Sequence, residues 1–359
     1  MILDQLTVPI VLAPLAGGPS TPQLTAAVGN SGGLGFLAAG YLSATTLAER
    51  LAQTRSLTGA PIGVNMFVPG VPAAPESVRA YAATLAGASR VAGADLGTPR
   101  FEDDDWAAKI DLMAANPVSV VSFTLGCPDR ATIGRLQDTG SEVWVTVTRP
   151  AEAVQAVSAG ADVLVAQGAE AGGHRSTFRD DPATDLTDGL GLLSLLQLLG
   201  ARTDLPLVAA GGIITGDGIA AVLAAGAAAA QLGTAFLRCP EAGTPEVHRQ
   251  AVAGAGPTAM TRAFTGRIAR GIRNQFLDEH SASAPAAYPE IHHLTAPLRQ
   301  AARAAGNADL VNLWAGQTHE LARELPAGQL VRELAQQARM ASRRAAGKLA
   351  STGQEADRR

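Results

Sequence analysis

Short apolar runs recur along the first two-thirds of the chain, and helix-like segments bordered by Gly or Pro separate them. Such runs, apolar on both faces, are typical of strands in a parallel sheet that is covered by helices. Eight runs qualify, and they begin at Pro9, Leu34, Pro61, Val118, Glu142, Ala161, Leu205 and Ala227. Since eight β-α units are the number that closes a barrel, we predict an α/β fold of the (β/α)8 TIM-barrel type. An open doubly wound sheet is the alternative, because periodicity alone does not show closure.

The strand rhythm stops after Phe236, and the chain then becomes rich in Ala with helical spacing. We therefore predict a barrel domain over residues 1–240 and a C-terminal helical subdomain over residues 241–338, on the substrate side of the barrel. Residues 339–359 mix small side chains with charges of both signs, and we predict a frayed helix and a flexible tail there.

Charge and cysteine content narrow the classes of function. The 359 residues carry a net charge of −4 without a basic stripe interleaved with aromatic residues, so we expect neither nucleic-acid nor membrane-surface binding. Two cysteines, Cys127 and Cys239, are too few for a disulfide framework, and a cytoplasmic location is expected. Apolar runs fall short of the roughly 18 residues that a transmembrane helix needs, so we expect no membrane span.

The stretch GLGFLA, Gly33–Ala38, matches the G-x-G-x-x-A pattern of a dinucleotide-binding fingerprint. That motif works only where its glycines follow a strand and open a helix, so that a pyrophosphate reaches the helix N-terminus. Here the glycines precede the predicted strand. We therefore reject a Rossmann site and predict that Gly33 and Gly35 form a helix C-cap and a tight turn.

The C-terminal ends of the strands are where a parallel barrel carries its reactive groups. These ends read APLAGG, NMF, SFTLG, TVTR, AQGAEAGGH, AAGGI and QLGTAF in chain order. They contain few carboxylates and many glycines, amides and backbone donors. Such a set suits a flat, polar, anionic cofactor better than a metal ion or a glycosidic bond.

The last two strand ends predict a phosphate site. Gly211–Gly212 closes the seventh strand and Gly233–Thr234 interrupts the eighth, which is where barrels commonly bind phosphate through backbone N–H groups. Asn65 and Gln167 end the third and sixth strands, and their carboxamides match the polar edge of an isoalloxazine ring. In the alternative interpretation the glycines only relieve crowding, and the two amides satisfy local backbone groups.

His174 is the only histidine of the strand-rich region, and it follows Gly172–Gly173 in a strand-end loop. An imidazole there is able to accept a proton from a carbon acid or to stabilise an anionic substrate near neutral pH. A structural or solvated histidine is the alternative. The remaining histidines are His248, His280, His292, His293 and His319, and their spacing matches no common metal site, so we predict none.

The sequence leaves two possible roles each for Cys127 and for a cluster of arginines. Cys127 follows the fourth predicted strand, and core or pocket lining is favoured over a nucleophile because no histidine lies near it in sequence. A cluster of arginines either contacts phosphate or forms surface and interface pairs. Its members are Arg262, Arg267, Arg270 and Arg273.

Taken in order, these motifs resemble the nitronate monooxygenase family, also called 2-nitropropane dioxygenase, whose members are FMN-dependent (β/α)8 barrels. The motifs that carry the resemblance are APLAGGPSTPQL, GGLGFLAAGY, GVNMF, SFTLGCP, QGAEAGGHR, VAAGGI, QLGTAF, TRAFTGRIARGIRN and LWAGQ. The combination of GGHR with LWAGQ at Leu313–Gln317 is the most specific part. Two positions depart from the family: Leu15 stands where Met is frequent, and HRST replaces the more usual HRG after His174.

The resemblance implies an FMN site and a catalytic histidine at His174. Its implied FMN contacts are Ala13, Pro14, Leu15, Asn65, Gln167, Gly172, Gly212, Gln231, Leu232, Gly233 and Thr234. It also implies oxidation of alkyl nitronates by O2 to a carbonyl compound and nitrite without NAD(P)H. The implied biological role is nitroalkane detoxification. A related FMN- and NAD(P)H-dependent enoyl-acyl-carrier-protein reductase and a non-catalytic flavin-binding protein are the alternatives.

Overall fold

Eight parallel strands form a closed barrel in the computed structural model, which describes residues 1–181, 183 and 189–356. Their order around the sheet is β1-β9-β8-β6-β5-β4-β3-β2. The strands are β1 (Ile10–Leu12), β2 (Gly35–Ala38), β3 (Ile62–Phe67), β4 (Val120–Thr124), β5 (Glu142–Val147), β6 (Val163–Gln167), β8 (Leu207–Ala210) and β9 (Ala229–Leu232). The N–H of Leu12 donates to Leu34 O at 2.9 Å, and this bridge joins β1 to the segment before β2. The predicted TIM barrel is therefore confirmed, and the open-sheet alternative is wrong.

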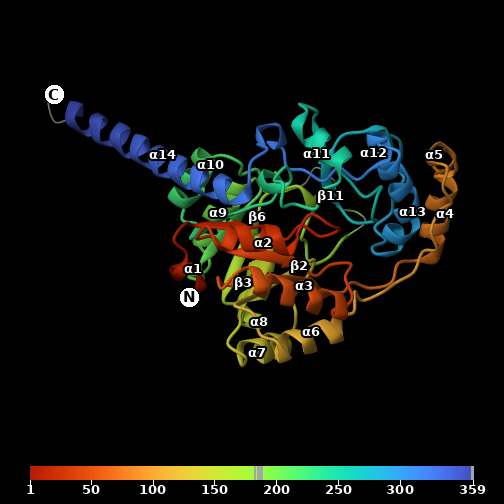
Figure 1. Cartoon of the computed structure of the whole chain (residues 1–359), viewed down its shortest axis with the longest axis horizontal. Helices are drawn as coiled ribbons and strands as arrows, with labels where there is room; N and C mark the ends of the chain where they lie inside the picture. The colour runs from red at the N-terminus through yellow and green to blue at the C-terminus, as the bar shows by residue number, and fades with distance from the viewer. Residues whose placement is uncertain (182, 184–188, 357–359) are drawn as a thin grey trace.

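One short helix, α1 (Ile2–Gln5), precedes the first strand and packs against the side chains inside the barrel, and helices between the strands cover the outside (Figure 1). The covering helices are α2 (Pro22–Gly29), α3 (Ala44–Leu57), α6 (Trp106–Ala115), α7 (Arg130–Gln137), α8 (Pro150–Ala159), α9 (Leu192–Gly200) and α10 (Gly216–Ala224). Local sequence sets their ends: Ser43 and Thr215 accept N-cap hydrogen bonds at the starts of α3 and α10. Gly160 ends α8 in the left-handed conformation, with φ of 101°.

Large apolar side chains fill the inside of the barrel. Phe36 of β2 and Trp144 of β5 are fully buried, and their ring centroids lie 5.9 Å apart. Gly63 on β3 makes room for them, because a Cβ at that position would overlap the Phe36 ring. The interior is thus packed, so a ligand has space only at the ends of the strands.

The structure bears out only part of the C-cap and turn predicted for Gly33 and Gly35. Helix α2 ends at Gly29 with Asn30 as its C-cap, and Gly35 lies within β2. A Cβ on Gly35 would overlap the carbonyl of Thr25 in α2. Gly35 therefore allows α2 to pack closely on the barrel. The predicted C-cap is wrong, because Asn30 caps α2, whereas Gly33 does lie in the turn after this helix, where its N–H donates to Val28 O at 3.3 Å.

The segment expected to be helical after the barrel also contains strands. Its elements are α11 (Glu246–Ala253), β10 (Thr258–Thr261), β11 (Ala269–Ile272), α12 (Gln275–His280) and α13 (Glu290–Ala304). Strand β11 pairs on one side with β10 and on the other with β7 (Gly173–His174), the short strand that follows β6. Helices α4 (Pro75–Thr84) and α5 (Ala86–Ala92) pack on α13, at the side of the molecule away from α14 (Figure 1).

Helix α14 (Ala327–Ala356) packs on α10 and α2, and its C-terminal half projects from the body of the molecule (Figure 1). The segment predicted to be a frayed helix and a flexible tail is thus helical through Ala356, as its Ala, Arg and Lys content favours, and residues 357–359 lie outside the described part. None of the helices in the described part combines the length and the hydropathy that a membrane span requires. The boundaries at 240 and 338 stay predictions.

Candidate active site

A cavity of about 560 Å³ lies at the C-terminal ends of the barrel strands. The strand ends contribute residues such as Asn65, Gln167 and Gln231 to its wall. The segment after the barrel supplies the facing wall, including Arg299 of α13 and Trp314. The cavity is therefore enclosed jointly by the barrel and by the C-terminal part of the chain.

Most of the predicted FMN contacts line this cavity. They are Ala13, Pro14, Leu15, Asn65, Gln167, Gly172, Gly212, Gln231, Gly233 and Thr234. Leu232 does not, because side chains alternate along β9 and its own side chain is buried in the hydrophobic core. Its carbonyl accepts a hydrogen bond from Ala13 N at 2.8 Å, which holds the first strand end in place.

The glycines after β8 and β9 form a cradle of free backbone donors. Gly211 and Gly212 have φ values of 121° and 66°, which favour glycine. Within the described residues, the N–H groups of Gly212, Gly233 and Thr234 donate no hydrogen bond. Unpaired amides that face a cavity suit a phosphate group, so this part of the site fits the phosphate end of FMN.

The LWAGQ segment and Thr318, which follows it, connect the two strand-end loops. Gly316 N donates to Thr234 Oγ1 at 3.0 Å, and the Thr318 hydroxyl donates to Gly212 O at 2.9 Å. Gly172 packs so closely on this segment that a Cβ there would overlap Ala315. This contact explains why a glycine precedes the histidine loop.

His174 projects into the cavity from β7. Its Nε2 lies 2.9 Å from Thr265 Oγ1, and its ring is surrounded by Phe67, Tyr288 and Trp314 at centroid distances of 6.4, 5.5 and 5.8 Å. Burial, together with the positive charges of nearby arginines, lowers the pKa of His174 to about 3. The ring is therefore neutral near pH 7 and lies in a pocket with aromatic walls.

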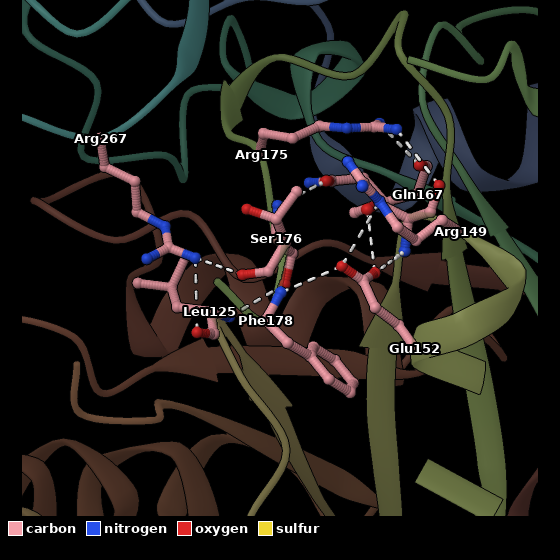
Figure 2. Close-up of polar contacts among 10 residues, drawn as sticks. Leu125, Arg149, Glu152, Gln167, Arg175, Ser176, Phe178 and Arg267 are labelled. Atoms are coloured by element: carbon pink, nitrogen blue, oxygen red, sulfur yellow. Dashed lines mark hydrogen bonds and ion pairs between the residues drawn. The ribbon is translucent and has the colours of Figure 1, made fainter. Parts of the chain in front are cut away.

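The loop that carries His174 is held by Gln167. The Gln167 Nε2 donates to His174 O at 3.0 Å, and its Oε1 accepts from Ser176 N at 2.8 Å. Arg175 donates to the backbone carbonyls of Gln167, at 2.8 Å, and of Thr148, at 3.3 Å. Figure 2 shows these side chains gathered on one side of the loop. One N–H and one lone pair of the Gln167 carboxamide are thus committed to the protein.

A buried carboxylate and a buried guanidinium hold the rest of this loop (Figure 2). Glu152 accepts hydrogen bonds from Thr148 N at 2.7 Å and from Phe178 N at 3.0 Å. Arg267 donates to the carbonyls of Leu125 and Thr177. These contacts join the loop that carries His174 to the ends of β4 and β5.

The carboxamide of Asn65 also uses only part of its hydrogen-bonding capacity within the protein. Its Nδ2 donates to Ser122 Oγ at 2.9 Å, and its Oδ1 accepts from Thr124 Oγ1 at 3.3 Å. One N–H and one acceptor site remain for a ligand.

The arginine cluster does not line the cavity. Arg262 pairs with Asp180 at 2.8 Å, and Arg273 pairs with Asp278 at 2.6 Å. Arg270 donates to Ala169 O and Thr258 Oγ1. Surface pairing, one of the two expected roles, applies only to Arg273, whereas Arg262, Arg267 and Arg270 are buried and bond groups inside the protein, which neither expected role described.

Sequence reasoning missed several residues that line the cavity from α11 and α13. Arg299 is buried, and its Nη2 donates to His292 O at 2.8 Å. Arg303 donates to Asn312 Oδ1 at 2.7 Å, and neither arginine pairs with a carboxylate among the described residues. His248 binds Trp314 O at 3.0 Å. The only signal in the sequence was the helical spacing of the two arginines, which does not say what they face.

Cys127 lies close to the site but does not line the cavity, and burial raises the pKa of its thiol to about 11. A thiol of this kind is protonated at neutral pH and is a poor nucleophile. This agrees with the interpretation of Cys127 as a packing residue.

The fold and the site define a (β/α)8-barrel enzyme whose ligand cavity lies at the C-terminal strand ends, next to one neutral histidine. The family model of nitronate monooxygenase matches residues 2–337. The chain therefore belongs to the nitronate monooxygenase family, and it is an oxidoreductase.

Individual relatives agree with this assignment. A nitronate monooxygenase of Pseudomonas aeruginosa is 41% identical over 347 residues, which cover 92% of this chain and 96% of the relative. One from Paraburkholderia phytofirmans is 40% identical, with 91% of each chain covered. A solved nitroalkane oxidase from Streptomyces ansochromogenes is 51% identical, has a TM-score of 0.93 and covers 96% of this chain and 99% of its own. FabK from Thermotoga maritima shares the fold, with 24% identity and a TM-score of 0.75, and the match covers 97% of this chain and 98% of FabK.

Proposed function

We propose that this protein oxidises alkyl nitronates with O2 to a carbonyl compound and nitrite, with FMN as cofactor and without NAD(P)H. The family supports the use of nitronates. The observation that carries the proposal is one cavity in which the free amides of Gly212, Gly233 and Thr234 lie at the strand ends that also present His174.

FMN would bind its phosphate at the glycine cradle and the edge of its ring at Asn65 and Gln167, through the donor and acceptor sites that these amides keep free. When bound, FMN supplies the electron acceptor for the oxidation. The protein supplies the surroundings. Phe67 and Trp314 line the cavity and would exclude water around the reacting group, while Tyr288 packs on the His174 ring. The uncompensated charges of Arg299 and Arg303 would attract an anion.

His174 would bind and orient the nitronate. A neutral imidazole keeps one N–H donor, which is able to hydrogen-bond to a nitronate oxygen without adding a second charge to the site. Since a nitronate is already deprotonated at carbon, its oxidation needs no strong base.

The test is nitrite production by the purified protein with FMN, ethylnitronate and O2, in the absence of NAD(P)H. His174→Asn is expected to reduce turnover while FMN stays bound. Activity only with NADH and a crotonyl thioester would favour the reductase, and activity in neither assay would favour a flavin carrier. A colourless protein that does not bind added FMN would overturn the proposal.

A further inference from the structure

The two nitrogens of the His174 ring have different surroundings. Nε2 lies 2.9 Å from the hydroxyl of Thr265, a residue that is only 1% exposed. Nδ1 has no hydrogen-bond partner among the residues that the structure describes, and the ring lines the cavity. A ligand in the cavity therefore meets Nδ1, and whether this atom donates or accepts depends on what Nε2 does.

The hydroxyl of Thr265 has one proton and two acceptors within reach. His174 Nε2 is at 2.9 Å, in the ordinary range, whereas Arg267 O is at 3.4 Å, at its limit. The N–H of Arg267 also points to Thr265 Oγ1, at 3.4 Å, and occupies a lone pair of the hydroxyl. The direction of the 2.9 Å contact follows the tautomer of His174, and a hydroxyl that gives its proton to the nearer of its two acceptors donates to Nε2.

A neutral imidazole that accepts at Nε2 carries its proton on Nδ1. We propose that Thr265 is a positioning residue that holds His174 in the Nδ1–H form, so that the ring offers a donor to an anionic nitronate and no base to a neutral nitroalkane. The ring is kept neutral by burial and by Arg267 and Arg299, which lower the pKa of His174. The statement on substrates rests on the proposed function, whereas the tautomer does not.

The tautomer is measured directly by long-range 1H–15N correlation on the FMN-loaded protein, labelled with 15N-histidine. The His174 signals are assigned by their loss in His174→Asn. We expect a protonated Nδ1 and an unprotonated Nε2 at pH 7, retained in Thr265→Ser and shifted toward protonated Nε2 in Thr265→Val. A wild-type ring with its proton on Nε2 would overturn the proposal, whatever the enzyme turns over.

A matched control comes from the same part of the chain. Thr261 is equally buried, and its hydroxyl bonds Ser281 at 2.7 Å rather than His174. Thr261→Val therefore removes a buried hydroxyl and should leave the His174 tautomer unchanged. A tautomer shift in this control would mean that loss of packing, not loss of the Thr265 proton, causes the effect, and it would overturn the proposal.

The consequence for substrates is tested by the ratio of kcat/KM for ethylnitronate to that for nitroethane. Loss of one oriented donor to an anion corresponds to about tenfold or more, so Thr265→Val should lower kcat/KM for ethylnitronate by that factor. The kcat/KM for nitroethane should not fall in Thr265→Val. In Thr265→Ser the ratio of the two kcat/KM values should return to that of the wild type. An equal loss on both substrates would contradict the role in selection. If neither substrate is turned over, the proposed function fails while the tautomer measurement still decides the role of Thr265.

Discussion

Polar side chains at the strand ends have two tasks, and Gln167 performs both. Its carboxamide bonds His174 O and Ser176 N, and it also lines the cavity. Sequence reasoning predicted the ligand-facing task because an amide at the end of a strand points into the mouth of a barrel. The loop-holding task matches the alternative interpretation, in which the amide satisfies backbone groups, but the sequence did not predict the partners His174 and Ser176, since they depend on how the chain returns after Gly172.

The loop-holding task predicts the effect of Gln167→Met. This variant keeps the size of the side chain and leaves the two backbone groups without a partner, so the free energy of unfolding should fall by about 1–3 kcal/mol. The kcat/KM per bound flavin should also fall, because His174 loses its support. Urea denaturation and the nitrite assay measure the two effects. Gln197→Met, on the exposed face of α9, is the control and should change neither; an unchanged kcat/KM in Gln167→Met would contradict this role.

Buried histidines make the stability depend on pH. Burial is the main reason that the pKa of His174 is lowered to about 3 and that of His248 to about 4. As the pH falls below about 6.5, the unfolded chain binds protons that the folded chain does not, so the free energy of unfolding decreases. We expect a loss on the order of 1 kcal/mol per buried histidine for each pH unit between 6.5 and 5.

Guanidinium denaturation at pH 7, 6 and 5 checks this dependence. His174→Asn should have a shallower slope than the wild type, because one titrating group is removed. A wild-type stability that stays constant from pH 7 to pH 5 would mean that these histidines titrate alike in the folded and unfolded chains.

At the scale of elements, the sequence predicted what local patterns determine. The eight barrel strands were predicted because their residues are apolar on both faces. The glycine cradle and His174 were then predicted to lie together, because the C-terminal ends of parallel strands meet at one rim. Strand β7 has two residues, and β11 carries Arg270, so neither has an apolar pattern; they form because they pair with each other. The arginines of α13 reach the cavity only through tertiary packing, which no local pattern records.

The contact between α10 and α14 depends on one glycine. A Cβ on Gly216 would overlap Gln337 and lie 2.5 Å from Ala338 N, so Gly216→Ala should push α14 away and cost about 1–3 kcal/mol of unfolding free energy. Gly218 lies in the same turn of α10, and a Cβ there has no neighbour closer than 3.5 Å. Gly218→Ala should therefore be neutral or slightly stabilising. The measurement is thermal unfolding of the two variants side by side. Equal melting temperatures would show that α14 shifts to accommodate the added methyl group without loss of stability.

At the scale of the whole molecule, one hydrophobic core joins the barrel to the C-terminal segment. Ile10 and Leu12 of β1 belong to the same cluster of buried side chains as Leu294 of α13 and Leu334 of α14. The cavity lies between these two parts, with walls from both. A ligand there contacts both parts at once, so its binding energy should stabilise the chain as a unit.

We therefore expect one cooperative unfolding transition in calorimetry, with and without FMN. At a free FMN concentration one hundred times its Kd, the folded state should gain about 2.7 kcal/mol, and the transition should move to higher temperature without splitting. Riboflavin is the control, because it lacks the phosphate that the amides of Gly212, Gly233 and Thr234 would bind, and an equal concentration should raise the melting temperature less. Two transitions, of which FMN moves only the one that belongs to residues 1–240, would mean that residues 241–338 fold separately and that the shared core does not couple them.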